Sequence, residues 1–100
     1  MPAYWVARAK VNDAAKYKKY SDQVPGIVVK YGGRFLARGG RFQIMEGSEK
    51  FQRFILIEFP TFARGVACFK SDEYNEASKI RRGGAGEIEA VIIEAVEATK

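Results

Sequence analysis

The sequence contains no histidine and only one cysteine, Cys68. Without histidine the chain cannot form a Ser-His-Asp triad, a Cys-His pair, a histidine-ligated haem, or most zinc and non-haem iron sites. A single cysteine excludes an intrachain disulfide. Chains without disulfides are typical of reducing compartments, so we expect a cytoplasmic location. An enzyme built from this sequence would use Asp, Glu, Tyr, Lys, Arg or Cys side chains, and we expect it to hold no metal and no cofactor.

Long apolar runs are also missing, because none approaches the roughly 20 residues that a membrane-spanning helix requires. The first residues show no basic segment followed by an apolar one, so we expect neither a signal peptide nor a membrane partner. The net charge of +5 is spread over short basic runs, which permit an anionic partner without requiring one. A chain of 100 residues buries only about 60–70% of its unfolded surface, so self-association would add to its stability.

The order of apolar and capping residues predicts an alternation of strands and helices. Alternating apolar residues indicate strands, and apolar residues at steps of three and four indicate helices. The predicted elements are a strand at 3–11, a kinked or two-part helix at 13–31 interrupted at Pro25-Gly26, an extended segment at 34–46, a turn at 47–52, a strand at 53–60, helices at 62–70 and 72–82 capped by Thr61 and Ser71, and a strand at 86–96. This order predicts one α+β domain over residues 1–100, with the ferredoxin-like βαββαβ fold and helices on one face of an antiparallel sheet.

The strand at 53–60 differs from the others because Phe54 through Ile57 are all apolar. Such a run is typical of a strand that is covered on both faces. One layer of helices covers only one face, so the second face needs another partner. In a chain this short, we expect that partner to be a second copy of the protein, giving a homodimer.

Two glycine pairs, Gly32-Gly33 and Gly39-Gly40, bracket a short extended run that carries two arginines. Glycine pairs mark bends and bulges. The second pair is either a two-residue hairpin turn or a bulge in one long bent strand, and we favour the bent strand. In a regular strand Arg34, Leu36 and Arg38 would share one face. A guanidinium beside apolar neighbours needs an internal carboxylate or an anionic ligand.

Glu58 is a candidate partner for Arg38, because it ends an otherwise apolar strand, where an unpaired carboxylate is unfavourable. Two interpretations stay open. In the first, Arg38 and Glu58 form a buried ion pair that fixes the register of two strands. In the second, they are catalytic residues, Arg38 holding a carboxylate or enolate and Glu58 acting as a base whose pKa is raised by its apolar surroundings.

Three tyrosines, Tyr17, Tyr20 and Tyr74, lie on predicted helices and either pack in the core or add hydroxyl groups to a pocket. If a pocket exists, we expect it between the sheet and the helices, with a compact, anionic and partly aromatic ligand. Cys68 is interpreted as a packed thiol, since no histidine is present to activate it. Arg81-Arg82 is interpreted as a charge cluster at a helix end.

Several segments together resemble one known family. They are Ala3-Tyr4, the Asp13, Tyr17 and Tyr20 positions, the 31–40 stretch with its Gly-Gly-Arg-Phe and Arg-Gly-Gly elements, Glu58-Phe59-Pro60 followed by Phe62, and Ser71-Asp72-Glu73-Tyr74. Through these segments the chain is similar to the domain of unknown function 1330 family, in the dimeric α/β-barrel superfamily. The resemblance covers nearly the whole chain and implies a homodimer whose two sheets face each other in a barrel.

The resemblance also implies a set of site residues. Those that match the family's pattern are Tyr17, Tyr20, Arg34, Arg38, Glu58, Ser71 and Tyr74. The superfamily includes cofactor-free monooxygenases, haem-degrading enzymes, muconolactone isomerases and haem peroxidases. The lack of histidine weakens the analogy with the haem and metal enzymes, and kinship of fold is in any case an association rather than a mechanism.

Two functions therefore stay open. The first is a cofactor-independent oxygenase or isomerase that acts on a small aromatic or lactone-like acid, with Tyr17, Tyr20, Arg34, Ser71 and Tyr74 binding the ligand. The second is a non-catalytic small-molecule-binding or accessory dimer. RNA-recognition domains share the strand order, but residues 53–59 lack their glycine and their stacking aromatics, so we expect no specific nucleic-acid partner.

Overall fold

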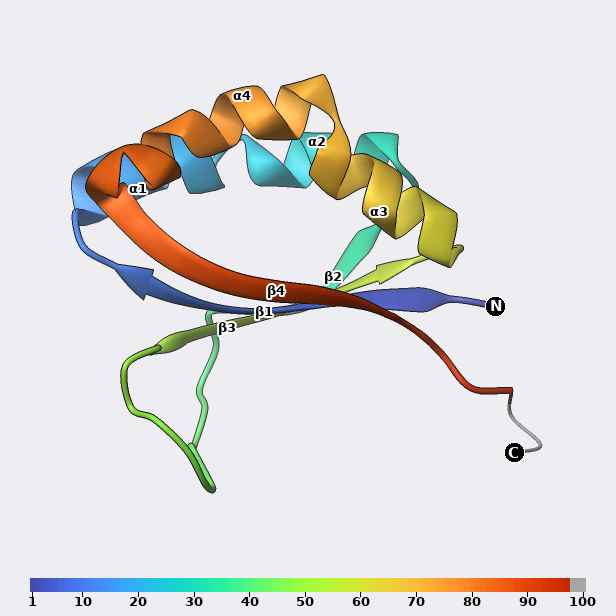
Figure 1. Ribbon diagram of the computed structural model, residues 1–100, viewed down its shortest axis with the longest axis horizontal. Coiled ribbons are helices and arrows are strands. Elements are labelled where there is room, and N and C mark those ends of the chain that lie inside the picture. The colour runs from blue at the N-terminus through green and yellow to red at the C-terminus, as the bar shows by residue number, and fades with distance from the viewer. Residues whose placement is uncertain (98–100) are drawn as a thin grey trace.

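The computed structural model describes residues 1–97 and contains a four-stranded antiparallel sheet with helices on one face (Figure 1). Its elements are β1 (Ala3–Val11), α1 (Ala14–Ser21), α2 (Val24–Lys30), β2 (Arg34–Arg38), β3 (Arg53–Phe59), α3 (Phe62–Lys70), α4 (Asp72–Ile80), a π-helical turn (Arg81–Ala85) and β4 (Gly86–Glu94). The strand order is β2-β3-β1-β4. The predicted α+β, ferredoxin-like fold is confirmed. Among residues 1–97, none of the helices has the length and hydropathy of a membrane-spanning segment.

The helices begin where short polar side chains cap them. Thr61 accepts a hydrogen bond from the backbone of Arg64, and Ser71 accepts one from Tyr74, which confirms both predicted caps. The predicted helix at 13–31 is two helices, but the break comes at residues 22–23, slightly before the expected position. Pro25 lies in the first turn of α2, where its missing N–H is tolerated, so it starts the second helix rather than interrupting the first.

Trp5 of β1 forms the centre of the core between the sheet and the helices, where it is almost wholly buried. Its ring stacks on Phe59 of β3 at 6.3 Å between centroids, and it meets Phe69 and Tyr74 edge-on at 5.3 Å and 5.1 Å. Offset and edge-to-face contacts of this kind are favoured by the ring quadrupole. The indole therefore ties the middle of the sheet to α3 and α4.

A β-bulge at Leu36 divides β2 into two parts. Before the bulge, Arg34 pairs with Glu58 of β3, and after it Arg38 pairs with Ile55. Because side chains alternate along a strand, the extra residue moves Arg38 to the helix side of the sheet while Arg34 stays on the opposite side. The prediction that Arg34, Leu36 and Arg38 share one face is therefore wrong.

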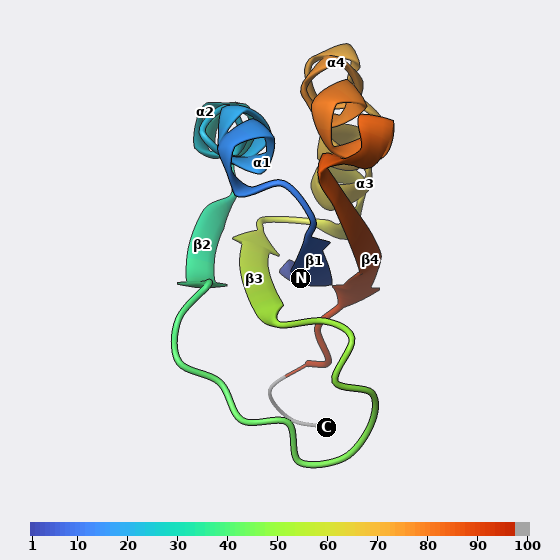
Figure 2. The ribbon, with the colours of Figure 1, turned by 90° about the vertical axis from the view of Figure 1, so that its left-hand side faces the viewer.

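Strand β2 ends at Arg38, Gly39 still donates a backbone hydrogen bond to Phe54 of β3, and the loop that follows, up to residue 52, extends below the sheet (Figures 1 and 2). Gly39 has a φ of +65°, a left-handed conformation that turns the backbone away from β3. The predicted extended segment at 34–46 is therefore too long, and Gly39-Gly40 is neither a hairpin turn nor a bulge in a bent strand. In the loop, Phe42 packs on Phe54 with ring centroids 4.9 Å apart.

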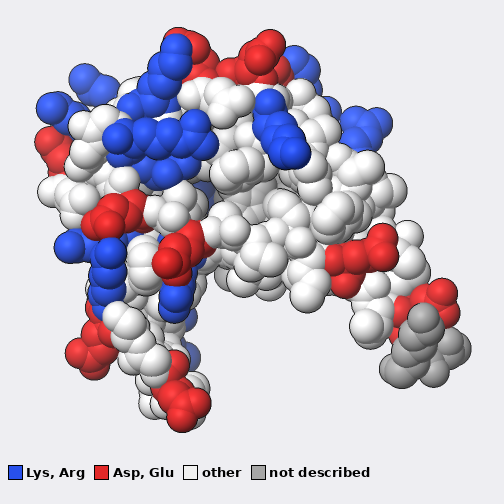
Figure 3. All heavy atoms as spheres, viewed as in Figure 1, with Lys and Arg blue, Asp and Glu red and all other residues white. Residues whose placement is uncertain are grey.

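The sheet face away from the helices is apolar at its centre. Val6 of β1 lies opposite Leu56 on one neighbouring strand and Val91 on the other. Val6, Val91 and Ile93 are exposed by 41%, 54% and 55%. Figure 3 shows the molecule arching over a hollow on this side, beside the loop. The apolar run in β3 is thus divided between two faces, as predicted, and coverage of the open face by a second copy stays a prediction.

Gly33, just before β2, packs closely against the side chains of Phe59 and Val28 because it has no side chain of its own. This close packing provides a test of the fold. A Cβ at this position would lie 2.7 Å from Phe59 Cε1 and 2.8 Å from Val28 Cγ1. We expect Gly33→Ala to lower the free energy of unfolding by about 1–3 kcal/mol through overpacking. Gly40→Ala is the matched control, because nothing lies within 4 Å of its added Cβ. Urea denaturation measures both, and equal stabilities of the two variants would contradict the packing.

Candidate functional site: an arginine and tyrosine pocket between α1 and the sheet

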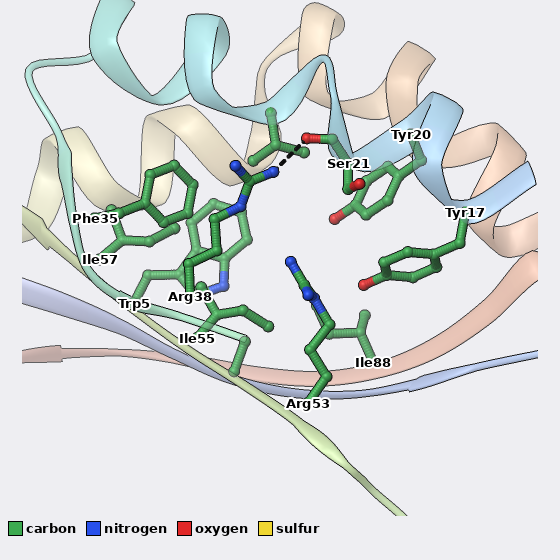
Figure 4. A pocket seen from close by; sticks show the side chains of 12 residues that line it. Trp5, Tyr17, Tyr20, Ser21, Phe35, Arg38, Arg53, Ile55, Ile57 and Ile88 are labelled. Carbon is green, nitrogen blue, oxygen red and sulfur yellow. Dashed lines mark hydrogen bonds between the residues drawn. The ribbon is translucent and has the colours of Figure 1, made fainter. Parts of the chain in front are cut away.

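A pocket lies between α1 and the start of α2 on one side and all four strands of the sheet on the other (Figure 4). Its walls are apolar and aromatic, with contributions from Trp5, Phe35, Ile55, Ile57 and Ile88. Its polar side chains are those of Tyr17, Tyr20, Ser21, Arg38 and Arg53. The cavity volume is about 30 Å³, enough for one or two water molecules. This is the location that the sequence predicted for a ligand, between the sheet and the helices.

Arg38 stands at the mouth of the pocket. Its Nη2 donates a hydrogen bond to the backbone oxygen of Ser21 at 2.6 Å, and its guanidinium lies 4.9 Å from the ring centroid of Phe35. The carbonyl is one of the unpaired groups at the end of α1, where a positive charge is favourable. Arg38 therefore joins β2 to α1 while its remaining N–H donors stay available.

Arg53 points into the pocket from the first position of β3, toward the hydroxyl of Tyr17 (Figure 4). The guanidinium packs directly against Gly39, where an added Cβ would displace it. Burial and the neighbouring Tyr20 raise the pKa of Tyr17, and the positive charges of Arg53 and Arg81 oppose that rise. The positive charge of Arg53 therefore acts on the hydroxyl of Tyr17.

The lining of this pocket includes no carboxylate. Among residues 1–97, the ion pairs engage other side chains, and neither Arg38 nor Arg53 belongs to one. Two guanidinium groups thus face a partly enclosed, largely apolar space without a counter-charge from the protein. Arg38 is exposed at the mouth and Arg53 is half-buried, so both guanidiniums can present N–H donors to an anion in this pocket.

A third arginine lies behind the tyrosines. Arg81 is only 5% exposed, and its Nη2 donates to the hydroxyl of Tyr74 at 3.4 Å. The hydroxyls of Tyr74 and Tyr20 are 2.7 Å apart, and the Arg81 guanidinium lies 5.3 Å from the ring centroid of Tyr20. Burial raises the pKa of Tyr20 well above its usual range, so this hydroxyl keeps its proton at neutral pH. Arg81 does lie at a helix end, as predicted, but it is buried against the tyrosines rather than forming a surface charge cluster with Arg82.

The expected pair of Arg38 with Glu58 does not form. Glu58 instead accepts a hydrogen bond from Nε of Arg34 at 2.9 Å, on the face of the sheet opposite the pocket. The side chain of Arg34 is 72% exposed, so this is a surface ion pair of small stabilising effect. The antiparallel register of β2 and β3 decides the partner, because it places Arg34 directly opposite Glu58 and Arg38 opposite Ile55, three residues away. The hypothesis that Glu58 acts as a base next to Arg38 is therefore wrong.

Ser71 and Tyr74 do not line the pocket either. Ser71 is buried at the junction of α3 and α4, where it caps α4 and donates to the backbone oxygen of Cys68 at 2.8 Å. Tyr74 lies in the core behind Tyr20. Of the seven side chains predicted to form a site, the structure brings Tyr17, Tyr20 and Arg38 together in this pocket. No group of three potential metal ligands occurs among the described residues.

The sequence analysis did not identify Arg53 and Arg81 as site residues. A signal was available for Arg53, because it shares the alternation of Ile55, Ile57 and Phe59, which all face the helices. No comparable signal marks Arg81, since the burial of a charged residue at the end of a helix depends on how the following turn packs.

Cys68 is buried, as predicted, and burial raises the pKa of its thiol to about 11. Because the thiolate is the reactive form, we expect Cys68 of the folded protein to react with a disulfide reagent at pH 8 at least about a hundredfold more slowly than a free thiol. A Ser48→Cys variant supplies a matched exposed thiol on the loop. Equal rates for both thiols would show that Cys68 is accessible.

Comparisons with solved structures agree with this fold. The chain is similar to the RPA0582 protein of unknown function from Rhodopseudomonas palustris, with a TM-score of 0.75 and 17% identity over 96% of this chain and 83% of that one. It is similar to a dimeric ferredoxin-like protein of unknown function from Jannaschia sp. CCS1, with a TM-score of 0.71 and 14% identity over 95% and 100% of the two chains.

The chain is also similar to SnoaB, a cofactor-independent oxygenase from Streptomyces nogalater, with a TM-score of 0.64 and 11% identity over 97% of this chain and 95% of that one. At these identities the likeness shows a common fold. No curated protein is significantly similar in sequence. A family model described as a domain of unknown function, DUF1330, matches residues 2–96. Because that match spans nearly the whole chain, the protein belongs to the DUF1330 family.

Proposed function

We propose that the protein binds a small aromatic carboxylate in the pocket between α1 and the sheet. The observation behind this proposal is that Arg38 and Arg53 face the pocket with no carboxylate in its lining. Arginine presents several N–H donors in one plane and matches a carboxylate in a bidentate fashion. The rings of Trp5 and Phe35 offer the flat apolar surface that an aromatic ring requires.

The size of the pocket limits the ligand. A cavity of about 30 Å³ is smaller than a benzene ring, so a ligand enters only when an arginine side chain moves. Arg38 is exposed at the mouth and is held by a single hydrogen bond to Ser21, so its long side chain is the part that moves. A single-ring acid is therefore the ligand class that fits best.

The polar groups of the pocket are suited to binding an anion rather than to removing a proton from a substrate. Its side-chain groups are the donors of Arg38 and Arg53 and the hydroxyls of Tyr17, Tyr20 and Ser21, and its lining includes neither a carboxylate nor a histidine to act as a base. Such donors stabilise negative charge on a bound molecule. We therefore place a non-catalytic small-molecule binder first among the two functions.

Cofactor-independent oxygenation is the second candidate, supported by the likeness to SnoaB, which is such an oxygenase. In this pocket a substrate would have to ionise without a protein base, and Arg38 and Arg53 would stabilise the resulting enolate or phenolate. A reaction that needs a carboxylate base does not fit these residues. The substrate class is the same in both candidates, an anionic single-ring molecule.

The proposal predicts that benzoate binds and that benzamide, which lacks the charge, binds more weakly. We expect Arg38→Met and Arg53→Met each to weaken benzoate binding by about tenfold or more, because each removes a charged hydrogen bond worth about 1.5–3 kcal/mol. Isothermal titration calorimetry measures the dissociation constants.

Arg34→Met is the matched control for these variants, because Arg34 lies on the other face of the sheet. We expect it to leave benzoate binding unchanged. Failure of the wild type to bind benzoate, or equal weakening in all three variants, would contradict the proposed site.

We also propose that two copies associate through the open face of the sheet. Val6, Val91 and Ile93 leave an apolar surface exposed there, and such a surface on a small domain is typical of an interface. The structural neighbour from Jannaschia is dimeric, which supports a dimeric state for this chain. Burial of both open faces against each other would remove this surface from water.

Association is tested by sedimentation equilibrium at micromolar concentration, for which we expect twice the chain mass of 11.2 kDa. Val6→Lys places a charge in the middle of the open face and should yield monomers. Val29→Lys is the control, because Val29 is 69% exposed on α2, on the helix side of the molecule. A well-folded wild-type monomer would refute the proposal.

A further inference from the structure

We propose that Arg81 and Tyr74 are positioning residues that act through Tyr20. In this arrangement, a chain of hydrogen bonds runs from Arg81 through Tyr74 to Tyr20 and directs the Tyr20 hydroxyl proton into the pocket. The ligand that receives this proton rests on the proposed function. The direction in which the hydroxyl protons of this hydrogen-bond chain point rests on burial and hydrogen-bond chemistry alone.

The first step concerns the hydroxyl of Tyr74. This residue has no exposed surface, so water does not reach its hydroxyl. A guanidinium can only donate, and Arg81 donates to the Tyr74 oxygen. Within the part of the chain that the structure describes, the Tyr20 oxygen, 2.7 Å away, is the acceptor found for the Tyr74 proton. If Tyr20 donated instead, the Tyr74 proton would be buried without an acceptor, which is strongly disfavoured.

The second step concerns the hydroxyl of Tyr20. With its oxygen accepting from Tyr74, its own proton is free to bind elsewhere. Tyr20 lines the pocket, and its hydroxyl points toward the pocket side of α1 (Figure 4). The pocket thereby gains a neutral donor with a fixed direction beside the two guanidiniums. A ligand atom at this point must accept a hydrogen bond, as a carboxylate oxygen does and an amide nitrogen does not.

The third step concerns the charge of Arg81, which has no carboxylate partner among residues 1–97. Arg81 follows the last turn of α4, where backbone carbonyls favour a cation, and it lies against the ring of Tyr20. Its Nε has no hydrogen-bond partner in the described part of the chain. As a buried cation at one end of the hydrogen-bond chain, Arg81 polarises the hydroxyl of Tyr74 and then that of Tyr20, which makes the Tyr20 hydroxyl a stronger donor.

The direction of the hydrogen-bond chain is tested in the wild-type protein without any ligand. Proton NMR should show a slowly exchanging tyrosine hydroxyl proton whose nuclear Overhauser contacts assign it to Tyr74. The Tyr20 hydroxyl proton should exchange rapidly with water in the pocket. Assignment of the protected proton to Tyr20, or rapid exchange of both protons, would overturn the proposed direction.

The positioning role is tested with benzoate and a double-mutant cycle. Tyr74→Phe keeps the buried ring and removes the hydroxyl, so we expect benzoate binding to weaken by roughly three- to tenfold. The same substitution should have no effect when Tyr20→Phe is already present, because Tyr74 acts only through Tyr20. Tyr31→Phe, outside the pocket lining, is the matched control and should bind as the wild type does.

The outcomes separate this inference from the proposed function. If the wild type binds benzoate but Tyr74→Phe weakens binding equally with and without Tyr20, or not at all, the positioning role is wrong and the proposed function stands. If the wild type does not bind benzoate, the proposed function and the positioning role toward an acid both fall, and the hydroxyl-proton assignment still decides the direction of the chain.

Discussion

One bulged residue in β2 determines where two arginines act. Arg34 and Arg38 are four positions apart, so in a regular strand they would lie on the same face of the sheet. The bulge at Leu36 separates them, and Arg34 meets Glu58 on the open face while Arg38 turns toward the helices. Glu58, the acidic residue of the neighbouring strand, is thus paired with Arg34 on the face away from the pocket. The pocket depends on this separation, because in a regular strand Arg38 would lie opposite Phe54 on the open face and would not reach the pocket.

The consequence is a pocket whose positive charge is balanced by weak partners. Arg38 is held by a backbone carbonyl, Arg53 lies beside Tyr17, and Arg81 lies against Tyr20 and Tyr74. Carbonyl dipoles and aromatic faces stabilise a cation only in part. Desolvated carboxylate partners would be stronger, but they would also leave nothing for a ligand to bind. The geometry therefore holds the three arginine side chains in place without giving any of them a carboxylate partner among residues 1–97.

Much of the fold was predictable from the sequence because it depends on local signals. Thr61 and Ser71 cap their helices by short-range hydrogen bonds, and the apolar run in β3 divides between two faces as strand periodicity requires. The pocket was predictable in location through Tyr17 and Tyr20. The errors came from features that no local pattern encodes. The strand register placed Arg34 beside Glu58, the bulge at Leu36 turned Arg38 toward the helices, and the burial of Arg81 follows from the packing of a turn.

The two edges of the sheet differ in their exposure to strand addition. The edge strand β2 is five residues long, bulged and flanked by arginines, all of which hinder pairing with another chain. The opposite edge strand, β4, is nine residues long and keeps one unbroken register with β1. Lateral growth of the sheet is therefore blocked beside the pocket and confined to β4. The irregularity that shapes the candidate site also protects that side of the molecule from aggregation.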